Sequence, residues 1–191
     1  LGLDVLGKRP NGYHDVRMVM QTIYLYDQII MEKKKESGIE ISTNLFYLPV
    51  NENNLAYRAA RLLMDEFDIH TGVKISLTKH IPVAAGMAGG SSNAAAVLYG
   101  MNRMYGLGLS MEELMERGVT LGADVPYCIM RGTVLAEGIG EILTPLPAMP
   151  KCQIVVAKPP VSVSTKMVYE KLDSHQIEEH PDIDGIIGGL E

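Results

Sequence analysis

Apolar and polar residues alternate along several stretches of the chain in the way that is typical of β-strands. In the segment 73–79, the side chains of Val73, Ile75 and Leu77 fall on one side, which predicts a half-exposed strand. The segment 16–25 is rich in Val, Ile, Met and Tyr and predicts another strand. Shorter strands are predicted at 28–32, 39–43, 133–136, 141–144 and 153–157. We expect the strands that precede residue 44 to form an antiparallel β region.

Helical spacing replaces this alternation elsewhere. The apolar positions between 55 and 67 share one helical face, which predicts a helix that Asn53 or Asn54 caps and that ends near Asp68. Ser110 and Glu113 have the spacing of a capping box, so a helix is expected from there to about Gly122. Further helices are predicted to open at Ser91 or Ser92, to cover 165–172 and to begin near 180. The mixture predicts an α+β protein.

Length, charge and cysteine usage narrow the class of protein. The 191 residues suffice for one large or two small domains, and a net charge of −6 argues weakly against a nucleic-acid binder. Cys128 and Cys152 belong to no CxxC or Cys/His pattern, so we expect reduced, buried cysteines in a cytoplasmic protein. No histidine pair predicts a metal site, and no apolar run is long enough to predict a membrane span. Both ends look as if they lie inside secondary-structure elements, which suggests a truncated chain.

A glycine-rich loop between the strand at 73–79 and the next helix carries the strongest chemical signal. Its small residues let the backbone approach a ligand closely, and the helix that follows turns free N–H groups and a positive dipole end toward the same ligand. A polyphosphate matches this arrangement, and a tight turn that packs a helix against a sheet is the structural alternative. The candidate phosphate-binding residues are Pro82, Val83, Ala84, Ala85, Gly86, Met87, Ala88, Gly89, Gly90, Ser91 and Ser92.

Two familiar nucleotide-binding motifs do not describe this loop. The loop has no Gly-Lys-[Ser/Thr] and is therefore not a Walker A loop, and it lacks the G-x-G-x-x-G spacing of a dinucleotide site. Gly138–Gly140 starts that spacing, but it lies between two short predicted strands, so we expect a hairpin turn there.

Two other segments add candidate chemistry. Asp124 follows the predicted end of a helix and precedes Pro126; it is either a turn residue or the carboxylate that phosphoryl transfer needs at the acceptor hydroxyl. Tyr13 and His14 follow a Pro-Asn-Gly turn, and they form either a surface turn or a pair that stacks on and hydrogen-bonds a planar ring.

Together these segments resemble the GHMP kinase superfamily. The resemblance rests on 82–94, which is similar to the superfamily pattern P-x-x-x-G-[LM]-x-G-[GS]-S-S-x-A. Arg9–His14, Gly122–Pro126, Lys158–Pro159 and Val163–Thr165 resemble one branch in particular, whose members phosphorylate the 2-hydroxyl of a cytidine diphosphate-linked methylerythritol in the non-mevalonate isoprenoid pathway.

The resemblance implies a fold and a set of roles. It implies a two-domain GHMP kinase fold, with a ribosomal-protein-S5-like, ATP-binding N-terminal domain at 1–147 and an incomplete C-terminal domain at 148–191. The loop would wrap the phosphates of ATP, Ser91 or Ser92 could reach Mg²⁺, and Asn53 and Asn54 would lie near the adenine. Asp124 would be the catalytic base. The residues implied to bind the cytidine-bearing substrate are Tyr13, His14, Thr165 and Tyr169.

Two departures and three alternatives stay open. The superfamily's catalytic Lys segment would precede Leu1, and its C-terminal glycine-rich motif would follow Glu191. The alternatives are a GHMP kinase of the homoserine or mevalonate type, a nucleotide-binding module without catalysis, and a dinucleotide-dependent reductase. The expected partner is a small molecule, with no nucleic acid and no membrane, and we expect a monomer or a homodimer.

Overall fold

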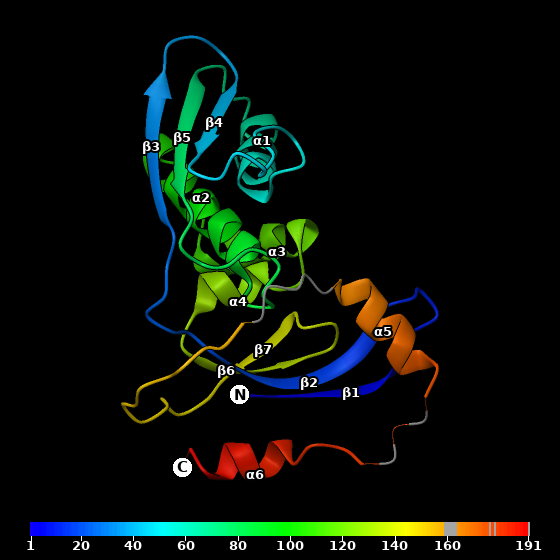
Figure 1. Cartoon of the computed structure of the whole chain (residues 1–191). Helices are drawn as coiled ribbons and strands as arrows, with labels where there is room; N and C mark the ends of the chain where they lie inside the picture. Colours follow the sequence, from blue (N-terminus) through cyan, green and yellow to red (C-terminus); the bar gives the residue numbers. More distant parts are fainter. Residues whose placement is uncertain (159–163, 176, 178, 191) are drawn as a thin grey trace. The chain divides into compact units, whose positions relative to one another are not determined.

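The computed structural model describes residues 1–158, 164–175, 177 and 179–190, without the side chains of Thr165 and Lys166. Its internal contacts divide the chain into two compact units. Unit 1 comprises Leu1–Ile23 and Arg131–Glu191, and unit 2 comprises Tyr24–Met130. Each unit is described by itself below (Figure 1). The division of the kinase domains at residue 147 stays a prediction.

Unit 2 contains a three-stranded sheet in which a parallel pair replaces part of the expected antiparallel region. The strand order is β3-β5-β4, with β3 antiparallel and β4 parallel to β5. The chain runs from β4 through the helix α1 before it returns as β5, and such a crossover is what a parallel pair requires. The expectation that the early strands pair with one another was therefore wrong for β3 and β4. The bounds are β3 Gln28–Lys34, β4 Ile39–Thr43, α1 Leu55–Glu66 and β5 Gly72–Thr78.

Helices build the core of unit 2 around β5. Val73, Ile75 and Leu77 of β5 are buried, and α1 and α2 pack against each other and against β4 and β3. The apolar stripe of α1 and the Ala-rich face of α2 supply most of the other core side chains. Two further helices pack on α2. The bounds are α2 Gly89–Tyr105, α3 Met111–Leu121 and α4 Val125–Met130.

The local helix signals are confirmed, and one helix was missed. Asn54 caps α1 through its side chain, and Ser110 and Glu113 form both hydrogen bonds of a capping box at α3. α4 was not predicted, because its six residues are too short to show a helical period and are mostly buried.

Unit 1 contains a four-stranded antiparallel sheet in the order β1-β2-β6-β7. The predicted turn at Gly138–Gly140 connects β6 to β7, and both glycines have positive φ. A short helix, α6, packs on β1 and β2, where the side chains of Ile183 and Ile186 fill the space beside Gly2. The bounds are β1 Gly2–Lys8, β2 His14–Gln21, β6 Thr133–Glu137, β7 Ile142–Pro145, α5 Thr165–Asp173 and α6 Ile183–Gly188.

Two expectations about unit 1 were wrong. The segment 153–157 forms no strand, and Val155 within it is 93% exposed. Its apolar residues suggested a strand, but in the described chain they have no neighbouring strand with which to pair. Cys152 is exposed rather than buried, and it is a free thiol like the partly buried Cys128.

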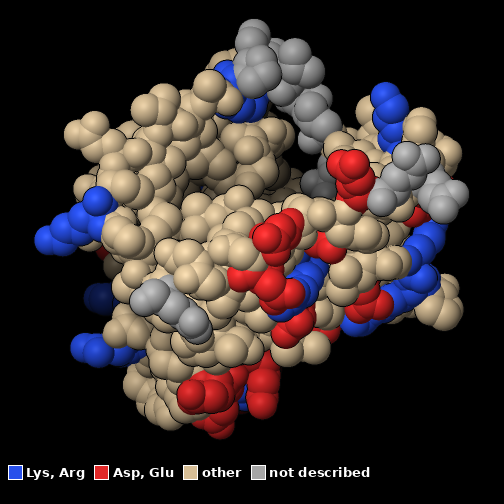
Figure 2. Space-filling model, turned by 90° about the horizontal axis from the view of Figure 1, so that it is seen from below, with Lys and Arg blue, Asp and Glu red and all other residues tan. Residues whose placement is uncertain are grey.

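Ion pairs are spread over both units. In unit 1, Arg17 bonds Asp184 at 2.6 Å, and in unit 2, Lys34 bonds Glu40 at 2.7 Å. Figure 2 shows acidic and basic side chains next to one another on the face drawn. Within the described residues, no helix has the length and apolar character that a membrane crossing needs.

Candidate functional site

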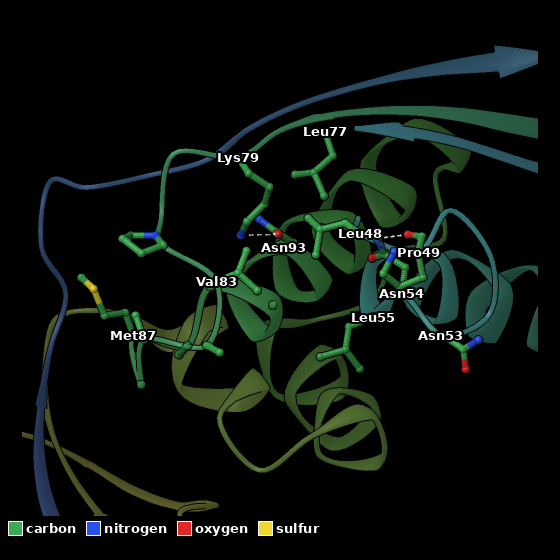
Figure 3. Close-up of a pocket in the computed structure, with 17 residues that line it drawn as sticks. Leu48, Pro49, Asn53, Asn54, Leu55, Leu77, Lys79, Val83, Met87 and Asn93 are labelled. Atoms are coloured by element: carbon green, nitrogen blue, oxygen red, sulfur yellow. Dashed lines mark hydrogen bonds between the residues drawn. The ribbon is translucent and has the colours of Figure 1, made fainter. Parts of the chain in front are cut away.

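The glycine-rich loop forms one wall of a cavity of about 320 Å³ in unit 2. Residues 82–90 line this cavity. The opposite side comes from the segment that leads into α1, and the end of β5 and the first turns of α2 complete it (Figure 3). The lining residues outside the loop are Leu48, Pro49, Asn53, Asn54, Leu55, Leu77, Lys79 and Asn93.

The loop presents its backbone to this cavity in an uncommon conformation. Ala84, Gly86 and Ala88 all have φ between 50° and 66°, in the left-handed region. Such a conformation is uncommon for alanine and is held only where the surroundings enforce it, often at ligand sites. Ala88 precedes α2, which begins at Gly89, two or three residues before the predicted start at Ser91 or Ser92.

The N-terminus of α2 is suited to bind an anion. Ala88 makes no side-chain cap, and the first turn holds no acidic residue. The first N–H groups of a helix have no partner inside the helix, and with the positive end of the helix dipole they attract negative charge. This geometry suits a phosphate-bearing ligand, and the phosphate-binding role of the loop stays a prediction.

Ser91 and Ser92 lie in the first turn of α2, outside the cavity wall as the structure describes it. The Ser92 hydroxyl donates a hydrogen bond to the Gly89 carbonyl at 3.0 Å. A hydroxyl at this position can still exchange its partner for a phosphate oxygen or for a metal ion that a phosphate carries.

Asn53 and Asn54 both line the cavity, but only one has a free amide. Asn54 accepts from the Ala56 N–H at 3.0 Å and donates to the Pro49 carbonyl at 2.9 Å, so its side chain holds the start of α1. Asn53 is exposed, and its side chain points away from the loop in Figure 3.

The sequence did not reveal a buried polar cluster beside the loop. The Lys79 ammonium pairs with the Asp27 carboxylate, and the two side chains are 5% and 1% exposed. Asn93 bonds both partners, to Lys79 at 3.0 Å and to Asp27 at 2.9 Å. No signal for this cluster exists in the sequence, because the residues come from three separate segments.

Asp124 lies directly before α4, in the same unit as the loop but outside the lining of the loop cavity. The residue is partly buried, and its burial raises the pKa of the carboxyl. Its carboxylate has no hydrogen-bond partner among the side chains and peptides that the structure describes. A partly buried carboxylate with a raised pKa has the properties of a candidate general base, and this role of Asp124 stays a prediction.

The raised pKa of Asp124 leads to a prediction about stability. The pKa of Asp124 is higher in the folded state than in the unfolded state. Ionised Asp124 therefore lowers the stability of the fold at a pH above the folded pKa. This loss of stability diminishes as the pH falls through the folded pKa. Asp124→Asn is therefore expected to raise the melting temperature at pH 8 by about 2–4 °C, the shift that ~1 kcal/mol gives in a chain of this size. Thermal scans from pH 4 to pH 8 measure the gain, which should shrink toward low pH. A gain that is equal at every pH would contradict the assignment.

In unit 1, two of the predicted substrate-binding residues, His14 and Tyr169, contact each other. His14 is buried, and its ring stacks on Tyr169 with 4.4 Å between the ring centroids. His14 Nε2 lies 2.6 Å from Asp173, and Lys8 donates to the other oxygen of that carboxylate at 2.6 Å. These two partners, Lys8 first, lower the pKa of Asp173.

The resemblance implies that His14 and Tyr169 both bind the cytidine-bearing substrate, and in this structure their two rings contact each other directly. Tyr13 is 58% exposed next to them in the chain and is available for a ligand. The side chain of Thr165 lies outside the description. The roles of these four residues stay predictions.

Comparisons with known proteins agree with the geometry of unit 2. The GHMP kinases N terminal domain family model matches residues 54–132, which include the loop and Asp124. The chain is 63% identical over 190 residues to a 4-diphosphocytidyl-2-C-methyl-D-erythritol kinase of Lachnospira eligens and 59% identical over 191 residues to that of Lachnoclostridium phytofermentans. Each match covers 100% of this chain and 66% of the relative, so the chain spans slightly less than two thirds of these proteins.

Solved structures share the fold. A crystal structure of 4-(cytidine 5'-diphospho)-2C-methyl-D-erythritol kinase superposes with a TM-score of 0.76 at 31% identity, over 99% of this chain and 67% of that one. A homoserine kinase of Cytophaga hutchinsonii superposes with a TM-score of 0.63 at 18% identity, over 100% of this chain and 67% of that one, and it shows the common fold alone.

Proposed function

Because this chain belongs to the 4-diphosphocytidyl-2-C-methyl-D-erythritol kinase family of the GHMP kinases, we propose that the whole protein phosphorylates 4-diphosphocytidyl-2-C-methyl-D-erythritol. The γ-phosphoryl group of ATP would pass to the 2-hydroxyl of this alcohol, in the non-mevalonate route to isoprenoid precursors. The observation that carries the proposal is the 63% identity along the full chain, joined to the phosphate-binding geometry of the loop. The proposed compartment is the cytoplasm, which supplies ATP and keeps thiols such as Cys128 and Cys152 reduced.

Binding of ATP rests on the loop cavity. The peptide N–H groups at the start of α2 would donate to the phosphates, with the residues 82–90 folded around them. The helix dipole and the absence of acidic residues from the first turn of α2 support the same role. Leu48, Pro49 and Leu55 give the far side of the cavity an apolar surface that suits a flat base.

Mg²⁺ fits the donors of this site as a companion of the nucleotide. Within the described residues, no group of three or more His, Cys, Asp or Glu side chains could hold a metal ion. At nucleotide sites Mg²⁺ is usually bound mainly by phosphates and water. Ser91 or Ser92 would add a hydroxyl ligand, and the ion would neutralise charge on the phosphates.

The chemistry of the transfer needs one base and a fixed acceptor. As the acceptor oxygen forms its bond to the γ-phosphorus, the bond from that phosphorus to the ADP oxygen breaks, and Asp124 takes the proton of the hydroxyl. Tyr13, His14 and Tyr169 would recognise the cytosine end of the acceptor, and Thr165 its polar tail. Positioning and charge stabilisation supply most of the catalysis in such transfers.

An acceptor panel with the full-length protein tests this function. ADP release and the mass of the product are measured with MgATP and 4-diphosphocytidyl-2-C-methyl-D-erythritol, homoserine or mevalonate. We expect turnover with the first acceptor and a kcat/KM for the other two that is lower by about 10⁴-fold, because a site built to hydrogen-bond one acceptor discriminates strongly against acceptors that lack the matching groups. Preferred turnover of homoserine or mevalonate would assign another GHMP kinase activity, and ATP binding without turnover of any acceptor would indicate a nucleotide-binding module.

A further inference from the structure

A buried ion pair lies next to the entrance of the phosphate loop. Asp27, Lys79 and Asn93 form this group, which we call the loop-base cluster. The Asp27 and Lys79 side chains are almost fully buried, and Asn93 is 5% exposed. Figure 3 shows the Lys79 and Asn93 side chains pointing toward each other, with a dashed line for the hydrogen bond between them.

The cluster holds the entrance of the loop. Asp27 precedes β3 and Lys79 follows β5, and the pairing of Gln28 with Thr78 brings them side by side. Besides the bonds within the cluster, the Asp27 carboxylate accepts the peptide N–H groups of His80 at 2.7 Å and Ile81 at 2.9 Å. These are the last two residues before the loop begins at Pro82, so one carboxylate fixes the direction in which the loop starts.

The cluster also holds the exit of the loop. Asn93 belongs to the second turn of α2, and its amide bonds both charged partners. The Lys79 ammonium lies close to Gly89, where a Cβ would stand only 3.1 Å from Nζ. The entrance peptides and the helix start are therefore tied to the same ion pair, and the seven residues 82–88 run between two fixed points.

The energetic cost of burying the Asp27–Lys79 pair supports a positioning role for the loop-base cluster. Burying two charges costs desolvation, and apolar residues of similar volume often stabilise a fold equally well. Lys79 also neutralises Asp27, so that the cluster places no net negative charge beside a phosphate site. The cluster thus provides hydrogen bonds to the loop entrance and to α2, which an apolar pair could not make.

We propose that the loop-base cluster positions the phosphate loop, so that the contribution of the nucleotide phosphates to binding depends on it. The proposal rests on the function proposed above. It makes Asp27 a positioning residue that holds the peptide groups at the loop entrance and the Lys79 ammonium, while Lys79 and Asn93 also line the cavity. Adenosine, which has no phosphates, provides the reference ligand.

The test is a comparison of ADP and adenosine binding to the full-length enzyme by calorimetry in the presence of Mg²⁺. The main variant is Asp27→Leu/Lys79→Met, which keeps the net charge and the approximate volume of the buried pair. We expect the ratio of the adenosine Kd to the ADP Kd to fall about tenfold, the size of effect that follows from losing hydrogen bonds to a charged group. The matched control is Lys34→Met/Glu40→Leu, which removes an exposed ion pair of the same unit and should leave the ratio unchanged.

Each result of this binding comparison either supports or overturns the proposed positioning role. An unchanged ratio in the Asp27→Leu/Lys79→Met variant overturns the proposal, and so does an equal weakening of both ligands, because that would be a purely structural effect. If this variant does not fold, Asn93→Ala is judged by the same ratio, since it keeps the ion pair and removes only the tie to α2. A wild-type enzyme that binds ADP no more tightly than adenosine would instead refute the phosphate site itself, which separates the two failures.

Discussion

Asp124→Ala in the full-length enzyme is expected to lower kcat about 10³-fold, within the range that a general base contributes. The affinity for ATP should stay nearly unchanged, because Asp124 does not line the cavity of the loop. Burial raises the pKa of this carboxyl, so the wild-type rate should fall on the acid side at a higher pH than for an exposed aspartate. Steady-state kinetics from pH 4 to pH 9 and a separate ATP titration measure both effects.

The control for this variant is Glu112→Gln, which changes an exposed carboxyl in the first turn of α3. It should leave kcat and its pH profile as in the wild type. Near-normal turnover of Asp124→Ala would show that another group accepts the proton. A parallel loss of ATP binding would show instead that Asp124 supports the fold of the nucleotide site.

Lys79→Met is expected to lower the free energy of unfolding by about 3–5 kcal/mol, because it leaves the Asp27 carboxylate buried without its cation. In the wild type, burial alone would raise the pKa of Asp27, but Lys79, the Ile81 and His80 peptides and Asn93 together lower it. Asp27 therefore stabilises the wild-type fold above its unfolded pKa, and this contribution is lost as the pH falls through the folded pKa. Denaturant titrations at pH 5 and pH 7 measure the change.

The deficit of Lys79→Met should be smaller at pH 5 than at pH 7, because the stranded carboxyl can then take up a proton. The double variant Asp27→Leu/Lys79→Met should recover most of the lost stability, since neither charge remains buried. Two results would contradict a buried Asp27–Lys79 pair. One is a Lys79→Met variant as stable as the wild type. The other is an Asp27→Leu/Lys79→Met variant no more stable than Lys79→Met. A double variant that is more stable than one of its single variants shows that the two stability changes do not add, as is expected for residues in contact.

Signals that lie within a few residues of one another predicted much of the fold. The cap at Asn54, the capping box of Ser110 and Glu113 and the alternation in β5 were all confirmed, because each reports a contact along the local chain. The pairing of strands was predicted less well. β4 is parallel to β5 because α1 comes between them, and no residue within β4 records that choice.

In the candidate site, too, local features were predicted from the sequence and contacts between distant segments were not. The sequence by itself determined the small-residue loop between a strand and a helix, and it predicted a phosphate site there, since the start of such a helix leaves free N–H groups. Only the tertiary structure decided what holds that loop: Asp27 meets Lys79 across 52 positions and Asn93 across 66. It likewise decided that His14 meets Asp173 across 159 positions. Such pairs carry no local pattern, because burial and strand pairing, rather than chain spacing, bring their charges together.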